Sequence, residues 1–253
     1  MTSPSTSLVW ADGKLVDGTE LTYEIKVEMG RLLGMSPVVY LRGTEQLETQ
    51  VDVLELGAKS LGYLDFDPAA ILAELIIAIE EHSSDLLVAS LMPGPTSHKA
   101  APPGVDWFLH VEEFMPHCLA AEPFSLAVAS SVRDNCSPSA NVLLLDDLEL
   151  ALGSRMDSNA MLWLNIEGNV ACADQSAVLV TERDFTYTPS LSDGAIETGW
   201  RRSAIASGAA VEASISPERL RAAQEVVLIT PWGERVAVTR IVGTTGKSSW
   251  TNA

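Results

Sequence analysis

Short runs of β-branched and aromatic residues alternate along most of the chain with segments whose apolar residues recur at helical spacing. This alternation constrains the fold strongly, because it is typical of sheets whose strands are joined by helices. Strands are expected at 8–10, 21–27, 38–41, 86–92, 105–111, 124–132, 160–165, 169–173, 177–181, 211–215, 226–229 and 235–242. Helices are expected at 44–61, 69–81, 141–153 and 196–207, with a short one after Ser216. The sequence therefore predicts a mixed α/β or α+β protein.

Local signals support several of these elements. Asp67-Pro68 and Ser216-Pro217 each combine a helix N-cap with a proline at the first helical position. Asn165 to Gly168 has the composition of a hairpin turn. Residues 115–123 lack clear periodicity, so we expect a boundary there. Two domains follow, a small N-terminal α/β domain at 1–120 and a larger C-terminal domain at 121–253.

Charge and cysteine content restrict the partners and the compartment. The formal net charge is −18, which opposes binding to phosphate backbones or anionic lipids. The most apolar segment, 69–79, is interrupted by Glu74 and is too short to cross a bilayer. The Ser/Thr-rich start lacks the features of a signal peptide, and three cysteines without CxxC spacing favour a reducing compartment. We expect a cytoplasmic protein without nucleic-acid or membrane partners.

Two weak motifs are set aside. The stretch from Gly243 to Ser248 resembles the end of a phosphate-binding loop, but no room for the required helix follows it. The metal-ligand types His110, Glu112, His117 and Cys118 match no standard zinc spacing. A half-buried strand and a loop histidine explain them better, so no metal site is expected.

The pair Arg201-Arg202 follows Gly199-Trp200 near an expected helix start. A helix N-terminus favours anions, and neighbouring guanidinium groups would strengthen that preference for a phosphate or a carboxylate. A solvated basic turn that balances an acidic surface remains the alternative interpretation.

The C-terminal half resembles the class IV aminotransferases and aminodeoxychorismate lyases, which are pyridoxal phosphate (PLP) enzymes of fold type IV. The resembling segments run in the family's order: 161–172, 177–180, 187–189, 195–202, 208–215, 224–229 and 233–238. Weaker matches in the N-terminal half are 10–16, 23–24 and 58–62. The resemblance implies a two-domain architecture like that of D-amino acid and branched-chain aminotransferases, with a cofactor cleft between the domains and a homodimer.

The resemblance also implies that the PLP site has been dismantled. The Schiff-base lysine is expected between Val132 and Asn141, where this sequence has no lysine. The glutamate that pairs with the pyridinium nitrogen aligns with Cys172, and the phosphate-binding arginine aligns with about Val53. The phosphate-binding isoleucine-threonine pair aligns with Trp200-Arg201, and a later threonine aligns with Pro231, which has no N–H. Ordinary PLP transamination is therefore not expected.

Three functional hypotheses remain. In the first, a remodelled cleft serves a PLP-independent enzyme or a binder of small anionic metabolites, with no cofactor. Its candidate catalytic residues are Cys172 and His110, and its candidate ligand-binding residues are Trp200, Arg201, Arg202 and Thr230. In the second, the chain is a structural or regulatory paralogue without catalysis (a pseudoenzyme), its cleft filled by side chains such as Trp200 and Leu143. In the third, an active PLP enzyme uses Lys99 as an unusual Schiff-base residue.

Overall fold

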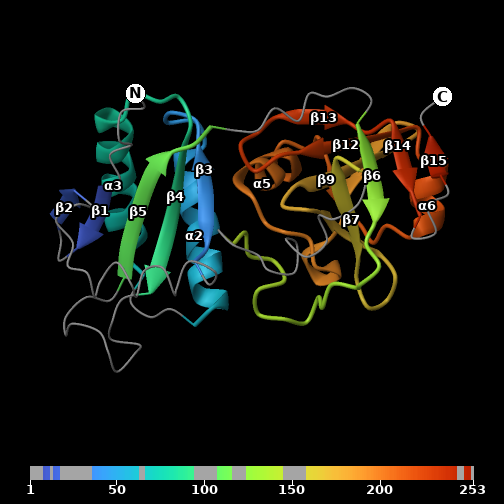
Figure 1. Ribbon diagram of the computed structural model, residues 1–253, viewed down its shortest axis with the longest axis horizontal. Helices are drawn as coiled ribbons and strands as arrows, with labels where there is room; N and C mark the ends of the chain where they lie inside the picture. The colour runs from blue at the N-terminus through green and yellow to red at the C-terminus, as the bar shows by residue number, and fades with distance from the viewer. Residues whose placement is uncertain are drawn as a thin grey trace. The chain divides into compact units, whose positions relative to one another are not determined.

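The computed structural model describes residues 8–11, 14–17, 36–62, 66–93, 107–115, 124–144, 158–243 and 248–251. The chain forms two compact units (Figure 1). One comprises Met1–Pro116 and Leu143–Asp147, and the other comprises His117–Val142 and Leu148–Ala253. The division thus falls close to residue 120, although a short later segment is grouped with the first unit.

The first unit contains one antiparallel sheet of order β2-β1-β5-β4-β3. Its strands are β1 (Leu8–Ala11), β2 (Lys14–Asp17), β3 (Val38–Leu41), β4 (Leu87–Pro93) and β5 (Trp107–Glu113), and its helices are α2 (Leu47–Ser60) and α3 (Pro68–Glu81). Both helices lie on the same side of the sheet in Figure 1. Alternate strand residues such as Leu41, Ala89 and Val111 join the core with α2 and α3. The neighbouring residues on each strand consequently belong to the opposite face of the sheet.

Helix α3 begins as the sequence predicts. The Asp67 side chain accepts hydrogen bonds from the backbone N–H groups of Ala69 and Ala70 at 3.0 and 3.3 Å, and Pro68 occupies the first turn. Two donors that lack helical partners are thereby satisfied. Helix α3 has apolar residues on its outer side as well, where Ile76 and Ile77 are exposed.

The second unit contains two five-stranded sheets, of order β11-β10-β9-β12-β13 and β15-β14-β6-β7-β8. Their strands are β6 (Ser125–Val128), β7 (Ala160–Leu164), β8 (Val170–Ala173), β9 (Ala177–Glu182), β10 (Phe185–Thr188), β11 (Val211–Glu212), β12 (Glu225–Ile229), β13 (Arg235–Ala237), β14 (Arg240–Val242) and β15 (Ser248–Thr251). The described residues of this unit also form a 3₁₀ turn, η3 (Leu191–Asp193), and helices α5 (Gly199–Ala206) and α6 (Pro217–Ala222). Strand β6 pairs in parallel with β7 and with β14.

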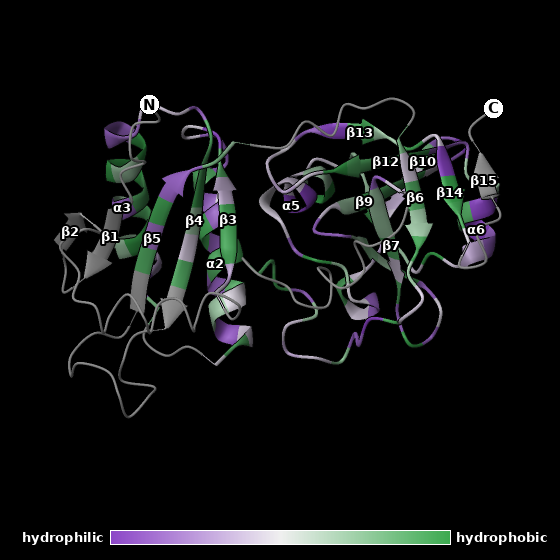
Figure 2. Cartoon of the chain, viewed as in Figure 1, coloured by the Kyte–Doolittle hydropathy of each residue, from purple (hydrophilic) through white to green (hydrophobic). Residues whose placement is uncertain are grey.

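Strand periodicity places α5 against one of these sheets. Val178 and Val180 of β9 face a core shared by the two sheets, whereas Ala177 and Leu179 face the opposite side. Trp200 and Ala204 of α5 pack against that opposite side. Figure 2 shows the contrast between the apolar strands and the more polar helix. The start of α5 is therefore fixed on a sheet that is packed on both faces.

Five sequence expectations differ from the structure. The strand expected at 124–132 spans only Ser125–Val128. Residues Asn141–Leu144 of the helix expected at 141–153 form a turn and a β-bridge of Leu144 with Pro37, while 145–153 lie outside the described residues. The helix expected at 196–207 begins at Gly199, because Thr198 caps it. The strand expected at 235–242 divides into β13, which pairs with β12, and β14, which pairs with β6 in the other sheet of this unit. The division falls at Thr239, whose N–H donates to the carbonyl of Phe124. The strand expected at 211–215 pairs only over Val211–Glu212.

The strand expected at 21–27 lies outside the described residues. Within the part of the chain that the structure describes, no helix has the length and apolar character needed to cross a membrane.

Candidate functional site at the start of helix α5

The segment from Pro189 to Arg202, here called the α5 turn, connects β10 to α5 through η3. Ser190 begins η3, and its hydroxyl accepts a hydrogen bond from the Asp193 N–H at 3.2 Å. Thr198 begins α5, and its hydroxyl accepts one from the Arg201 N–H at 3.1 Å. Gly194 has φ +89°, where a side chain would be strained. Hydroxyl caps and one glycine thus explain why this segment turns twice within a few residues.

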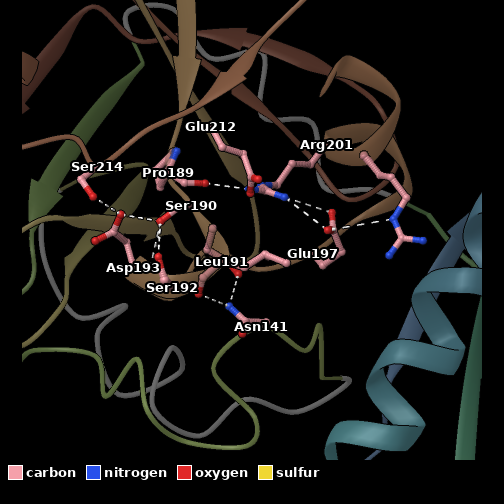
Figure 3. Close-up of polar contacts among 12 residues, drawn as sticks. Asn141, Pro189, Ser190, Leu191, Ser192, Asp193, Glu197, Arg201, Glu212 and Ser214 are labelled. Atoms are coloured by element: carbon pink, nitrogen blue, oxygen red, sulfur yellow. Dashed lines mark hydrogen bonds and ion pairs between the residues drawn. The ribbon is translucent and has the colours of Figure 1, made fainter. Parts of the chain in front are cut away.

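Arg201 is the central charged group of the α5 turn (Figure 3). Its side chain is 1% exposed. Nη1 donates to Glu197 Oε1 at 3.2 Å, while Nη2 donates to the Pro189 carbonyl at 2.7 Å and to Glu212 Oε1 at 2.5 Å. Glu197 is buried, whereas the Glu212 side chain is 43% exposed. Arg201 therefore bridges two carboxylates from different elements and fixes the turn onto β11.

Arg202 points its charge toward the same acceptor. Its Nε lies 4.0 Å from Glu197 Oε2, and its side chain is 33% exposed. The cluster of Arg201, Arg202, Glu197 and Glu212 contains two positive and two negative groups, so its formal charge is zero. A second basic residue at this helix start does not create a net positive site.

Asp193 holds the opposite end of the α5 turn. Its Oδ1 accepts hydrogen bonds from the side chains of Asn165 and Asn169 at 3.2 and 3.3 Å, and its Oδ2 accepts them from Ser190 and Ser214 at 2.6 and 2.7 Å. Burial alone would raise the pKa of Asp193, but these four hydrogen bonds to the charged form outweigh it and lower the pKa. Asp193 is thus a satisfied structural carboxylate.

Two asparagines fasten the loop after β6 to the α5 turn. The Asn141 amide donates to the carbonyls of Leu191 and Ala195 at 2.7 and 2.8 Å, and the Asn141 carbonyl accepts the Glu197 N–H at 2.9 Å. The Asn135 amide donates to the Ser192 carbonyl at 2.9 Å. Asn141 is at the end of the interval in which the resemblance implies a Schiff-base lysine. Here its side chain holds the loop after β6 against the α5 turn.

Trp200 and Thr230 both lie at the turn between β12 and β13. Thr230 is fully buried, and its hydroxyl accepts the Glu234 N–H at 2.9 Å, while its carbonyl accepts the Gly233 N–H at 2.9 Å. The Trp200 ring lies directly against Gly233. The structure therefore brings all four predicted ligand-binding residues to the start of α5, with Arg201 and Thr230 committed to protein partners.

The candidate catalytic residues lie elsewhere. Cys172 is buried on β8, opposite Trp163 of β7. His110 is on β5 in the first unit and is half-buried, while Lys99 lies outside the described residues. His117 and Cys118 also lie outside them, and the described residues contain no group of three metal-ligating side chains. Leu143, predicted as a cleft-filling side chain, is buried, and its carbonyl accepts the Val38 N–H within the first unit.

Sequence reasoning missed the residues that organise this turn. The Glu197–Arg201 pair has the i, i+4 spacing of a helical ion pair, which was a usable signal. Ser190 and Asp193 have the spacing of a capping motif. Asn141 carried no signal, because its partners are carbonyls about fifty residues away along the chain.

Comparison with known proteins agrees with this architecture. The family model for amino-transferase class IV matches residues 54–241, which is more than half of the chain. No curated protein matches this chain.

Three solved structures illustrate the likeness in fold. Branched-chain aminotransferase from Thermoproteus uzoniensis with norvaline is 19% identical, with a TM-score of 0.76 over 96% of this chain and 89% of that one. The PLP form of branched-chain aminotransferase from Thermobaculum terrenum is 14% identical, with a TM-score of 0.73 over 94% and 87%. The 4-amino-4-deoxychorismate lyase from Pseudomonas aeruginosa is 18% identical, with a TM-score of 0.72 over 97% and 94%. Together with the family match, the two-unit mixed fold shows that this chain belongs to the class IV aminotransferase family and has its type IV fold.

Proposed function

We propose that this chain uses the class IV fold without PLP and does not perform transamination. Instead it serves as a PLP-independent enzyme or a binder of a small molecule. The observation that carries this proposal is the Arg201 cluster, because it neutralises the helix start at which the family resemblance implies a phosphate group.

The polar groups at this helix start do not fit a phosphate. A phosphate dianion needs unpaired N–H donors and a positive field. Here the Arg201 N–H is bound to the Thr198 hydroxyl and the Arg202 N–H to the Thr198 carbonyl. The buried Glu197 carboxylate adds a negative charge at the same turn. A phosphate would find these two donors already bound and the Glu197 carboxylate beside them.

The loop after β6 supplies no amine. Residues 132–141 contain no lysine, and the Asn141 amide is hydrogen-bonded to two carbonyls. An amide nitrogen is not a nucleophile, so Asn141 cannot form a covalent link with an aldehyde. Cys172 adds no carboxylate where the resemblance implies the partner of a pyridinium nitrogen.

A titration with PLP, followed by borohydride reduction and intact-mass analysis, tests the proposal. We expect no saturable absorbance change and no reduced adduct. One reduced adduct that maps to a single lysine would overturn the proposal, and mapping to Lys99 would establish the active-PLP hypothesis instead. Lysozyme, which has surface lysines but no PLP site, is the control for nonspecific adducts.

If a small anion binds at the α5 turn, Arg202 is the group that contacts it. Arg201 is 1% exposed and holds two carboxylates, whereas Arg202 is 33% exposed. Titration with acetate, a small carboxylate, and Arg202→Gln as the variant test this step. Loss of binding in the variant supports it, while unchanged binding places the anion elsewhere.

The non-catalytic alternative has one observation in its favour. Trp200 packs directly on Gly233, so an apolar ring occupies the space beside the helix start. A paralogue of this kind would bind none of a panel of small metabolites in thermal-shift assays. The homodimer that the resemblance implies belongs to either version of the proposal, and sedimentation velocity tests it.

A further inference from the structure

A groove lies between the two helices of the first unit. Helices α2 and α3 contact each other and lie on the same side of the sheet (Figure 1). The groove has a volume of about 460 Å³ and is open to solvent. The start of α2, with Leu47 and Glu48, forms one wall, and Leu72 and Ile76 of α3 form the other. We call it the α2–α3 groove.

The α3 wall of the groove is more apolar than a solvent-facing helix surface normally is. A helix packed on a sheet buries one apolar stripe and carries polar residues on its opposite face. Helix α3 already contributes Ile71 and Leu75 to the core. Ile76 and its neighbour Ile77 are nevertheless 39% and 40% exposed, and Leu72 is half-buried. Adjacent exposed apolar residues outside the core are typical of an interaction surface.

Acidic side chains border this apolar surface. Glu48 lines the groove, and Glu45 is exposed just before α2. Asp52 follows Glu48 by one helical turn, and Glu80 follows Ile76 by one turn, so each lies on the same face of its helix as the groove residue before it. Both are exposed. The groove therefore has an apolar wall and an acidic rim.

Few positive charges balance this rim. Residues 42–62 and 66–82 contain eight acidic and two basic side chains, which gives a formal charge of −6 with His82 neutral. Of the two basic residues, Lys59 is near the other end of α2 and pairs with Glu55 at 2.8 Å. Arg42 is exposed between β3 and the start of α2. The helix pair consequently attracts cations more than anions.

We propose that the α2–α3 groove binds a cationic amphipathic helix of a partner protein. In this mode of recognition, apolar side chains spaced by three or four residues enter a hydrophobic groove. Here they would contact Leu72 and Ile76. Lysine or arginine residues beside the apolar stripe would face Glu45 and Glu48, and such complementary charges raise the association rate and select the partner.

The same charges oppose two other occupants. A twofold contact between copies of this chain would use the same patch on both copies, so it would bring two acidic rims together. Like charges placed against each other are unfavourable at an interface. An anionic membrane surface would be repelled for the same reason. A cationic helix satisfies both the apolar wall and the acidic rim.

A designed peptide tests the proposal on the whole protein. It has about 18 residues, long enough to form a helix, with leucines at helical spacing on one face and lysines on the other. Fluorescence anisotropy of the labelled peptide measures the Kd. We expect saturable binding that weakens about fivefold or more when the salt concentration rises from about 0.05 to 0.3 M, because salt screens exposed charges.

Two further peptides separate the apolar and the charged contributions. A scrambled peptide of the same composition has no leucine face and should bind about fivefold more weakly or not at all. A peptide with glutamate in place of each lysine keeps the leucine face but should not bind, because its charge is that of the rim.

Two pairs of variants locate the site. Ile76→Gln should weaken binding of the cationic peptide about fivefold or more, whereas Ile166→Gln, at an exposed isoleucine of the second unit, should change the Kd less than about twofold. Glu48→Lys should weaken binding about fivefold or more, whereas Glu225→Lys, at an exposed glutamate of β12, should change the Kd less than about twofold. Circular dichroism and thermal unfolding verify that the four variants are folded.

Several results would overturn the proposal. They are absence of saturable binding, equal binding of the scrambled peptide, and equal effects within either pair of variants. A lower sedimentation coefficient in Ile76→Gln would show that a second copy of the chain occupies the groove instead. Binding to phosphatidylglycerol vesicles that is lost in Ile76→Gln would show a membrane contact. None of these measurements involves PLP, so their results are independent of the function proposed above.

Discussion

The indole ring of Trp200 lies so close to Gly233 that a Cβ on this glycine would be 2.5 Å from Cε2 of the ring. The contact joins the first turn of α5 to the turn between β12 and β13. Gly233 also has φ +89°, a conformation that L side chains rarely adopt. The glycine is therefore required twice, once for its backbone and once for the space that the ring occupies.

Gly233→Ala should destabilise the protein by about 3–4 kcal/mol, because left-handed strain and a steric clash with the ring add up. Gly208→Ala is the matched control. Gly208 also has a positive φ, +74°, but a Cβ added there would have nothing within 4 Å. It should cost only about 1–2 kcal/mol from backbone strain. Urea unfolding measures both, and equal costs would show that the Trp200 ring moves away freely.

The charges around Arg201 lead to a second prediction. Arg201→Met removes the donor that hydrogen-bonds the buried Glu197 and leaves only Arg202, whose Nε is 4.0 Å away; it should lower the free energy of unfolding by about 3–5 kcal/mol. Adding Glu197→Gln to the same chain removes the uncompensated charge and should restore at least about 1 kcal/mol.

Arg221→Met provides the comparison, since Arg221 pairs with Glu218 at 3.5 Å on the surface, where both side chains are more than half exposed. It should cost less than about 0.5 kcal/mol. If Arg201→Met costs no more than Arg221→Met, the buried cluster has no structural role.

Elements with local signals were predicted best. The N-caps at Asp67 and Ser216, the strand at Val38–Leu41 and the Asn165–Gly168 turn are confirmed, because each depends on a few adjacent residues. The division of the strand expected at 235–242 could not be foreseen, since it depends on the hydrogen bond of Thr239 with Phe124, 115 residues away. Register between distant segments is not encoded in local periodicity.

The candidate site shows the same limit. The arginine pair was found from sequence, because charge near a helix start is a local pattern. Its pairing with Glu212, and the clamping of the turn by Asn141, depend on contacts between separate elements. The expectation of an anion site followed from the two arginines alone. The carboxylates of Glu197 and Glu212 that neutralise these arginines could be identified only from the structure.

Asp193 leads to a prediction about acid stability. Its four side-chain hydrogen bonds lower its pKa below 3.8, so the stability it contributes is present above pH 3.8 and is lost as the pH falls through the folded-state pKa. Asp193→Asn should cost about 1–3 kcal/mol at pH 7, because an amide NH₂ would face donors from serine or asparagine. The difference in free energy of unfolding between the original chain and Asp193→Asn should become smaller below pH 3.8. A constant difference from pH 7 to pH 3 in urea unfolding would contradict this role.

The contribution of Asp174 to stability should change with pH in the opposite direction. Burial raises its pKa to about 6, although the hydrogen bond from the Met161 N–H lowers it in part. A carboxyl group with a raised pKa costs stability as the pH rises from 3.8 through about 6. Asp174→Asn removes the charge, retains an acceptor for the Met161 N–H and tolerates the φ of +43° at this position.

The variant should therefore be more stable than the original chain by about 1–2 kcal/mol at pH 8, with the gain vanishing near pH 4. Asp184→Asn is the control, because Asp184 is exposed in the turn between β9 and β10. It should shift the melting temperature by less than about 2 °C at either pH. Calorimetry of the three proteins at pH 4 and pH 8 makes the comparison. A gain of equal size at both pH values would show that the benefit of Asp174→Asn does not come from removing a buried charge.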